Sequence, residues 1–206
     1  MTVLIGAAAV LLVAWFAAGT LWNVRLGGQV MRWMQAGGEG GLRVIGERAT
    51  VRWLGSSVVE LVINEGKAAL ARAAVVIFME PRDLPWWPLS RIRGRRDTLI
   101  IRGVLRQSPS VELEVLDPAS WSGRDALRRV PKEWPARDFK QLKIFGEHPR
   151  AEALLARAER SGLQVRRLSI RRAEPNLQLH VALPDRARPS RELFEAVHDL
   201  SELALK

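Results

Sequence analysis

One uninterrupted apolar run at the start of the chain limits the folds that the chain can adopt. Residues 2–22 read TVLIGAAAVLLVAWFAAGTLW, and no charged side chain occurs before Arg25. A helix rises about 1.5 Å per residue, so about 20 such residues cross the roughly 30 Å hydrocarbon core of a bilayer. The run therefore predicts a transmembrane anchor over residues 1–23.

The residues that flank this run predict its orientation. The expected interface residues are Trp22, Arg25, Arg32 and Trp33, because tryptophan and cationic side chains favour the membrane surface. No Lys or Arg precedes the run, so the positive-inside rule places the N-terminus outside and the body in the cytoplasm, on a single-pass protein of the cell membrane. Two alternatives are a cleaved signal peptide, with small residues at 17–19 as its cleavage site, and a buried core helix.

Residues 24–41 are expected to connect the anchor to the body. Leu26, Val30 and Trp33 recur at helical spacing, which predicts a juxtamembrane helix along the membrane surface. The sequence AGGEGG at 36–41 predicts a flexible linker.

The region 42–118 reads as an antiparallel β-rich unit, because short runs of Val, Ile and Leu alternate with turn signals. The expected strands are 50–55, 58–64, 74–80, 98–106 and 111–116. The link between the second and third is too short for a usual parallel crossover, so a meander is expected. In the last strand, Glu112 and Glu114 alternate with apolar residues, which predicts one buried and one solvated face.

The remainder reads as a connector and a second α+β unit. Residues 119–140 contain prolines and no sustained periodicity, as expected of a connector. Residues 141–206 predict the order β-α-β-β-α, most of a ferredoxin-like module. Its expected elements are a strand at 141–145, a helix at 149–162, a hairpin of 165–172 with 177–183, and a helix at 189–205. The predicted fold class is therefore α+β.

Composition and motifs limit the kinds of catalytic and binding site that the chain can form. The net charge is +10, which predicts attraction to phosphates on lipids or nucleic acids. The absence of cysteine excludes disulfides, thiolate catalysis and Cys-ligated zinc. The three histidines lack zinc-binding spacing, and no serine elbow, phosphate loop or dinucleotide motif occurs. No catalytic, cofactor or metal residue is therefore predicted, although an enzyme with dispersed catalytic residues is an open alternative.

The stretch EPRDLPWWPLSRIRGRRD at 80–97 combines aromatic surface with positive charge. Its candidate contact residues are Trp86, Trp87, Arg91, Arg93, Arg95 and Arg96. One interpretation is that the tryptophans pack on the core and the arginines are solvated. The others are contact with anionic lipid headgroups, contact with a protein partner, and binding of single-stranded nucleic acid, which a membrane location disfavours.

The letters PWWP at 85–88 resemble the signature of the PWWP domains, small β-barrels that bind methylated histone tails and DNA. The resemblance covers these four residues and the basic stretch that follows them. In that family the motif lies early in the barrel, whereas here it follows three expected strands and an apolar span. No binding residue is therefore carried over from the family.

Together these features predict a membrane-anchored, non-enzymatic accessory or scaffold subunit of a membrane protein complex. Its basic, Trp-bearing cytoplasmic face is expected to meet anionic lipid headgroups, a membrane-protein partner, or both. No cofactor or small-molecule substrate is expected. The alternatives are a membrane-bound enzyme and a module that binds nucleic acid or another anionic surface.

Overall fold

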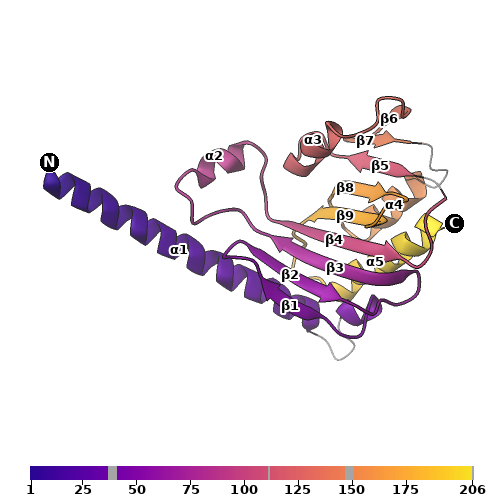
Figure 1. The fold of residues 1–206 in the computed structure, drawn as a ribbon, viewed down its shortest axis with the longest axis horizontal. Helices are drawn as coiled ribbons and strands as arrows, with labels where there is room; N and C mark the ends of the chain where they lie inside the picture. The colour runs from indigo at the N-terminus through magenta and orange to yellow at the C-terminus, as the bar shows by residue number, and fades with distance from the viewer. Residues whose placement is uncertain (37–40, 111, 147–150, 206) are drawn as a thin grey trace.

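The computed structural model describes residues 1–36, 41–110, 112–146 and 151–205. Within these residues, the long apolar helix α1 (Thr2–Gln35) is followed by an α+β body built on one nine-stranded antiparallel sheet (Figure 1). This confirms the predicted fold class and the long N-terminal helix. Residues 37–40 of the expected linker, residue 111 of an expected strand and the start of the helix expected at 149 lie outside the described residues.

The strands arise where β-branched and leucine side chains alternate with polar ones. They are β1 (Thr50–Trp53), β2 (Val58–Ile63), β3 (Leu70–Phe78), β4 (Thr98–Leu105), β5 (Leu113–Leu116), β6 (Ala136–Phe139), β7 (Leu142–Phe145), β8 (Val165–Ile170) and β9 (Leu177–Ala182). Their order across the sheet is β1-β2-β3-β4-β9-β8-β5-β7-β6. All eight expected strands are present, and β6 is an additional strand inside the expected connector.

The strands and helices predicted for residues 141–206 are present, but they do not form a sheet of their own: β4 and β9 pair and join the two β-rich regions into one sheet. Ile101 of β4 lies opposite Leu179 of β9. In addition, β5 lies between β8 and β7, so the strand expected to begin the module pairs only with β5 and β6. The order of elements along the chain does not specify which strand edges meet, and β5, which is buried along its whole length, requires a neighbour on both sides.

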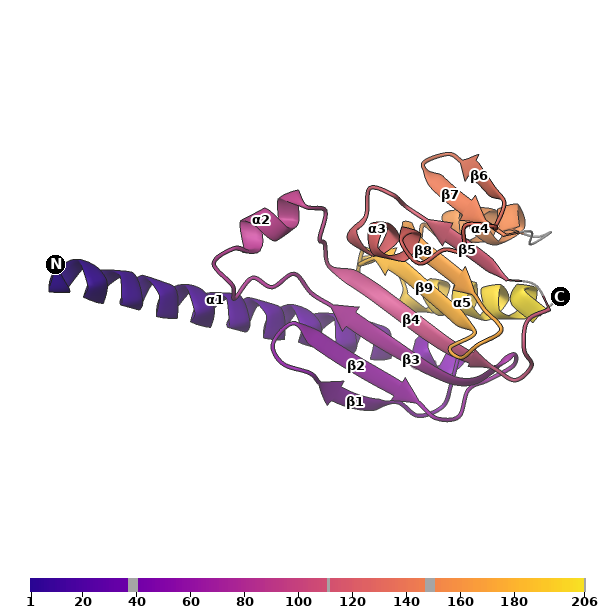
Figure 2. The same ribbon diagram turned by 45° about the horizontal axis from the view of Figure 1, so that its top comes forward.

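Helices cover one face of the sheet and bury the core. The last part of α1, α4 (Ala151–Arg160) and α5 (Ser190–Leu205) contribute buried side chains to one cluster with the strands (Figures 1 and 2). A short 3-10 turn, η1 (Gly41–Val44), packs against α5. The predicted buried stripes are confirmed, with Leu154 and Leu155 on α4 and Leu193, Val197 and Leu200 on α5 among them.

Two shorter helices lie away from this layer. Helix α3 (Trp121–Leu127) begins at Ser120, whose Oγ accepts a hydrogen bond from the Gly123 N–H. Helix α2 (Trp87–Ile92) projects from the β3–β4 connection and lies alongside α1 in both views (Figure 2). Within the Trp-rich stretch, residues 87–92 thus form a short helical finger.

Helix α1 has two halves with different surroundings. Residues 1–18 are exposed, whereas one face of the rest is buried at Gly19, Asn23, Gly27, Val30 and Met34. The predicted juxtamembrane helix therefore exists as a continuation of α1, and one of its faces packs into the protein core. The same three- and four-residue spacing suits either apolar environment, so the pattern alone does not choose between them.

The prediction of a solvated Glu114 is also wrong. Its side chain is buried and accepts hydrogen bonds from Arg167 Nε at 2.5 Å, Ser169 Oγ at 2.8 Å and Arg171 Nη2 at 3.0 Å. Because these partners come from β8 and the residue that follows it, the pairing of β5 with β8 creates the site. A buried carboxylate is stable when such cationic donors surround it.

His180 lies on the sheet face opposite the helix layer and lines a small cavity with Trp121 and Arg166. Among the described residues, neither of its ring nitrogens has a hydrogen-bond partner. Burial, together with the positive charges of Arg167 and Arg102, lowers the pKa of His180 from 6.5 to about 3. The folded protein therefore keeps this imidazole neutral at physiological pH.

We expect acidification from about pH 6.5 to about pH 5 to destabilise the protein through His180. The unfolded chain takes up a proton here below pH 6.5, whereas the folded chain takes it up only near pH 3. The free energy of unfolding should therefore fall by about 1.4 kcal/mol per pH unit, or about 2 kcal/mol in all. In denaturant titrations of the full chain in detergent, His180→Leu should remove this component; equal pH slopes for the two proteins would contradict it.

Candidate functional site at the base of the anchor helix

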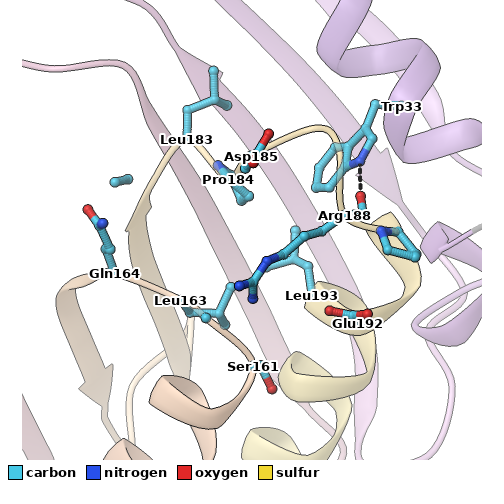
Figure 3. A pocket seen from close by; sticks show the side chains of 13 residues that line it. Trp33, Ser161, Leu163, Gln164, Leu183, Pro184, Asp185, Arg188, Glu192 and Leu193 are labelled. Atoms are coloured by element: carbon cyan, nitrogen blue, oxygen red, sulfur yellow. Dashed lines mark hydrogen bonds between the residues drawn. The ribbon is translucent and has the colours of Figure 1, made fainter.

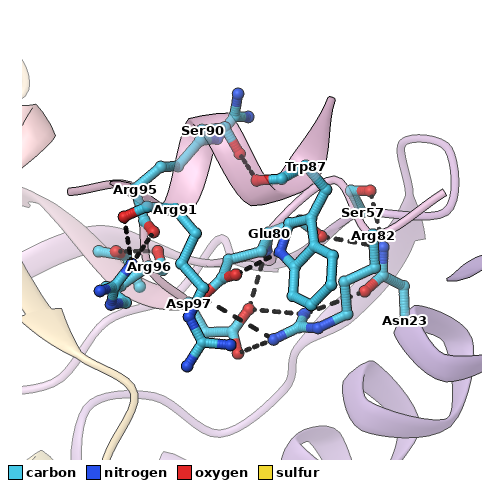
Figure 4. A network of polar contacts seen from close by, with 11 residues as sticks. Asn23, Ser57, Glu80, Arg82, Trp87, Ser90, Arg91, Arg95, Arg96 and Asp97 are labelled. Carbon is cyan, nitrogen blue, oxygen red and sulfur yellow. Dashed lines mark hydrogen bonds and ion pairs between the residues drawn. The ribbon is translucent and has the colours of Figure 1, made fainter. Parts of the chain in front are cut away.

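A buried asparagine joins α1 to the body. Asn23 Nδ2 donates to Ser57 Oγ at 3.0 Å and to the Glu80 carbonyl at 3.1 Å (Figure 4). Its Oδ1 accepts from Arg82 Nη1 at 3.1 Å. Every hydrogen-bonding group of this amide except one lone pair is thereby used, which makes its complete burial energetically tolerable.

Arg82 and Asp97 form the charged centre of this joint. The guanidinium donates two nearly parallel hydrogen bonds to the carboxylate, from Nη1 at 2.9 Å and from Nη2 at 2.7 Å. The same carboxylate accepts from the Glu80 backbone N–H at 2.8 Å. Bidentate pairs of this kind are directional, so they hold the β3–α2 loop in one orientation relative to α1 (Figure 4).

Two small residues let the helix approach the body closely. A Cβ atom added at Gly19 would lie 2.3 Å from the Arg82 carbonyl oxygen, and one added at Gly27 would lie 2.9 Å from the Trp53 ring. Contacts this short do not occur for real Cβ atoms. Glycine at these two positions is therefore what allows the loop and β1 to lie directly on α1.

The two candidate tryptophans have different surroundings. Trp87 turns toward α1, where its Nε1 donates to the Glu80 carboxylate and its ring centroid lies 6.5 Å from that of Trp15. Trp86 is 57% exposed. The third-residue spacing from Trp86 places Leu89 (59% exposed) and Ile92 (82% exposed) on the same side of α2. The finger α2 therefore presents an exposed apolar face beside α1.

The four candidate arginines also separate into two pairs. Arg91 and Arg93 are exposed on α2 and at its end. Arg95 instead lies over Phe78, with its guanidinium carbon 4.9 Å from the ring centroid, and burial lowers its pKa while Glu80 raises it. Arg96 donates to the Arg91 carbonyl at 2.6 Å and so caps the end of α2. Arg91 and Arg93 are therefore the pair whose side chains form no hydrogen bond with the described part of the fold, whereas Arg96, although exposed, is bound to the end of α2.

The predicted interface residues of α1 do not lie at the same position along the helix axis. Trp22 and Arg25 are exposed close to the joint. Trp33 lies eleven residues beyond Trp22, about 16 Å further along the helix axis, and its Nε1 donates to the Arg188 carbonyl at 2.7 Å. Arg32 is exposed on the same distant turn. The structure thus brings Trp22 near Trp87 and Arg91, and it places Arg32 and Trp33 elsewhere.

The sequence analysis did not identify the residues that build this joint. Asn23, Ser57, Arg82 and Asp97 are far apart in the sequence and match no motif. One signal was available: Asn23 lies four residues from both Gly19 and Gly27, so small or polar residues mark one side of an otherwise apolar helix. Such a stripe indicates close packing against another element.

A second cavity lies on the helix side of the body. It has a volume of about 410 Å³ and lies between Trp33 of α1, the α4–β8 turn and the loop before α5 (Figure 3). Arg188 and Glu192 border it, and the Arg188 guanidinium lies over Gly162. Across the described ranges, no group of three or more His, Cys, Asp or Glu side chains could hold a metal ion.

Comparison with known proteins assigns no class to this fold. No protein-family model matches the chain, and no curated protein matches it. Among the described residues, one helix, α1, is long and apolar enough to cross a membrane; a helix of this kind is either an anchor or a signal sequence. Any function must therefore be argued from the geometry of the joint.

We expect Asn23→Ala to destabilise the protein by about 1–3 kcal/mol, because Ser57 Oγ, the Glu80 carbonyl and Arg82 would each lose a buried partner. Asn64→Ala is the matched control, since Asn64 is exposed and should change stability by less than about 0.5 kcal/mol. Denaturant titrations in detergent measure both values. Equal effects of the two substitutions would show that the joint contributes nothing.

Proposed function

We propose that this chain is a single-span membrane protein whose body is held directly against the cytoplasmic leaflet, where it serves as a non-enzymatic accessory or scaffold subunit. The observation that carries this proposal is the continuity of α1. Its first half is exposed and apolar, and its second half is part of the body's core without an intervening break. A body fixed in this way presents its surfaces to membrane partners in one orientation.

The packing of α1 favours an anchor over a cleaved signal peptide. The small residues at 17–19 that suit a cleavage site lie within a continuous helix, and Gly19 is pressed against the Arg82 backbone. A protease requires an extended, accessible chain at the bond that it cuts. Since the buried residues begin at this point, the helix is better suited to remain attached.

The length of the exposed half supports close contact between body and bilayer. Residues 2–18 extend about 25 Å as a helix, which is slightly less than the hydrocarbon thickness. The joint at Gly19 and Asn23 must then lie at the membrane surface. Because Trp87 touches Trp15, the finger α2 lies about one turn nearer the bilayer than Gly19. Its apolar face of Trp86, Leu89 and Ile92 is suited to the headgroup region.

The partners of the buried and half-buried carboxylates support an accessory role. Buried Glu80 accepts from Trp87, and half-buried Asp97 pairs with Arg82. Buried Glu114 pairs with Arg167 and Arg171, and buried Asp117 pairs with Arg166. These groups are fixed by Trp87 and by arginines within the fold and do not line the cavities described above. The net charge of +10 then gives the protein a positive outer surface, which complements the anionic cytoplasmic leaflet.

The membrane topology can be tested with single cysteines, because the chain contains none. We expect alkaline extraction to leave the full chain in the membrane fraction. In intact cells, an impermeant maleimide should label a Thr2→Cys variant, whereas an exposed Glu133→Cys variant should require lysis. Release by alkali, a shortened chain that begins near residue 20, or labelling of the body from outside would each refute the proposal.

Insertion of α2 is tested by an environment-sensitive fluorophore on Ile92→Cys, compared with the same probe on Glu133→Cys. In vesicles that contain the full chain, the probe at 92 should emit at shorter wavelength and should be quenched severalfold by spin-labelled lipid, because its side chain would lie in the interface. The probe at 133 should behave as in water. Identical, water-like emission at both positions would show that α2 does not touch the bilayer.

A further inference from the structure

A groove runs between the exposed half of α1 and the finger α2. It has a volume of about 380 Å³. Its walls include Trp15, Ala18, Gly19 and Trp22 from α1 and Trp87 and Arg91 from α2. Three indole rings and two small residues thus meet a guanidinium at the point where the apolar helix joins the body.

We propose that this groove binds one anionic phospholipid, with its phosphate on Arg91 and an acyl chain along α1. The site rests on the proposed membrane location, since it gives that location a discrete ligand. The ligand is amphipathic because the groove is: its charged end faces the body, and its apolar end opens toward residues 1–18, which are exposed and apolar.

The charge in the groove comes from Arg91. Arg82 also borders the groove, but its guanidinium is bound by the Asp97 carboxylate and the Asn23 amide. Across the part of the chain that the structure describes, Arg91 forms no ion pair and instead lies 5.9 Å from the centre of the Trp87 ring. A guanidinium positioned over an indole keeps its N–H donors free for a phosphate, which it can bind through two oxygens.

The apolar part of the groove follows from residue size. Ala18 and Gly19 leave the surface of α1 low between the larger rings of Trp15 and Trp22. The rings of Trp15 and Trp87 are inclined by 50° and stand 6.5 Å apart, so they enclose a slot and do not fill it. Indoles at this level of a membrane protein contact the glycerol and upper acyl region of lipids. A small soluble anion would make no use of these walls.

The charged end is tested by binding of phosphatidylglycerol to the purified full chain in detergent, measured by native mass spectrometry against phosphatidylcholine. We expect the wild-type chain to retain one phosphatidylglycerol in preference to phosphatidylcholine. Arg91→Gln should weaken this binding about fivefold or more, as loss of one cation at a membrane surface predicts. Arg93→Gln is the matched control, because it removes the same charge from an exposed residue that does not line the groove.

The apolar end is tested separately by filling the groove without changing charge. Ala18→Leu should weaken phosphatidylglycerol binding severalfold, because the added side chain would occupy the slot. Ala17→Leu is its control, since Ala17 is exposed on the same helix but does not line the groove. Inorganic phosphate in excess should not displace the lipid if both ends of the site contribute.

The outcomes of these experiments distinguish the proposed lipid site from the proposed membrane anchor. Selective loss in Arg91→Gln and Ala18→Leu supports the lipid site. Equal loss in Arg91→Gln and Arg93→Gln, retention of phosphatidylcholine as readily as phosphatidylglycerol, or displacement by phosphate would overturn it and leave the membrane anchor intact. Release of the chain by alkaline extraction would instead refute the anchor itself, whatever lipid the purified protein binds.

Discussion

The rest of the structure depends on one buried amide, that of Asn23, and on the arginine–carboxylate pair that it contacts. Apolar side chains alone are equally stable in lipid and in a protein core. The Asn23 amide is not, because its donors and acceptor are satisfied by the body and would have no partners in hydrocarbon. The helix position at which the exposed apolar half of α1 ends and the half packed in the body begins is therefore marked by hydrogen bonding.

This joint also determines what the Trp-rich stretch can do. Trp87, Arg95 and Arg96 are used within the fold, where they hold the finger α2 in place. Trp86 and Arg91 remain on its surface. One continuous stretch thus combines residues packed within the fold with residues on its surface, and contact with lipid or a partner stays a prediction for the surface residues alone.

Local features of the chain could be predicted, whereas long-range pairings could not. The apolar helix and the eight expected strands follow from composition and periodicity over short windows. The contact of Asn23 with Arg82 spans 59 residues, and the pairing of β4 with β9 joins segments more than 70 residues apart. Glu114 illustrates the consequence: its alternation correctly predicted a strand, but its burial depended on which strand became its neighbour.

The absence of a break between the two halves of α1 has a mechanical consequence. A helix of 34 residues is a stiff rod about 51 Å long, and its lower part is fixed in the sheet-bearing body. Any tilt of the upper part is transmitted to the body as a rotation of equal angle. In a bilayer, helix tilt responds to hydrocarbon thickness. The orientation of the whole sheet relative to such a bilayer would therefore vary with the thickness of the surrounding lipid.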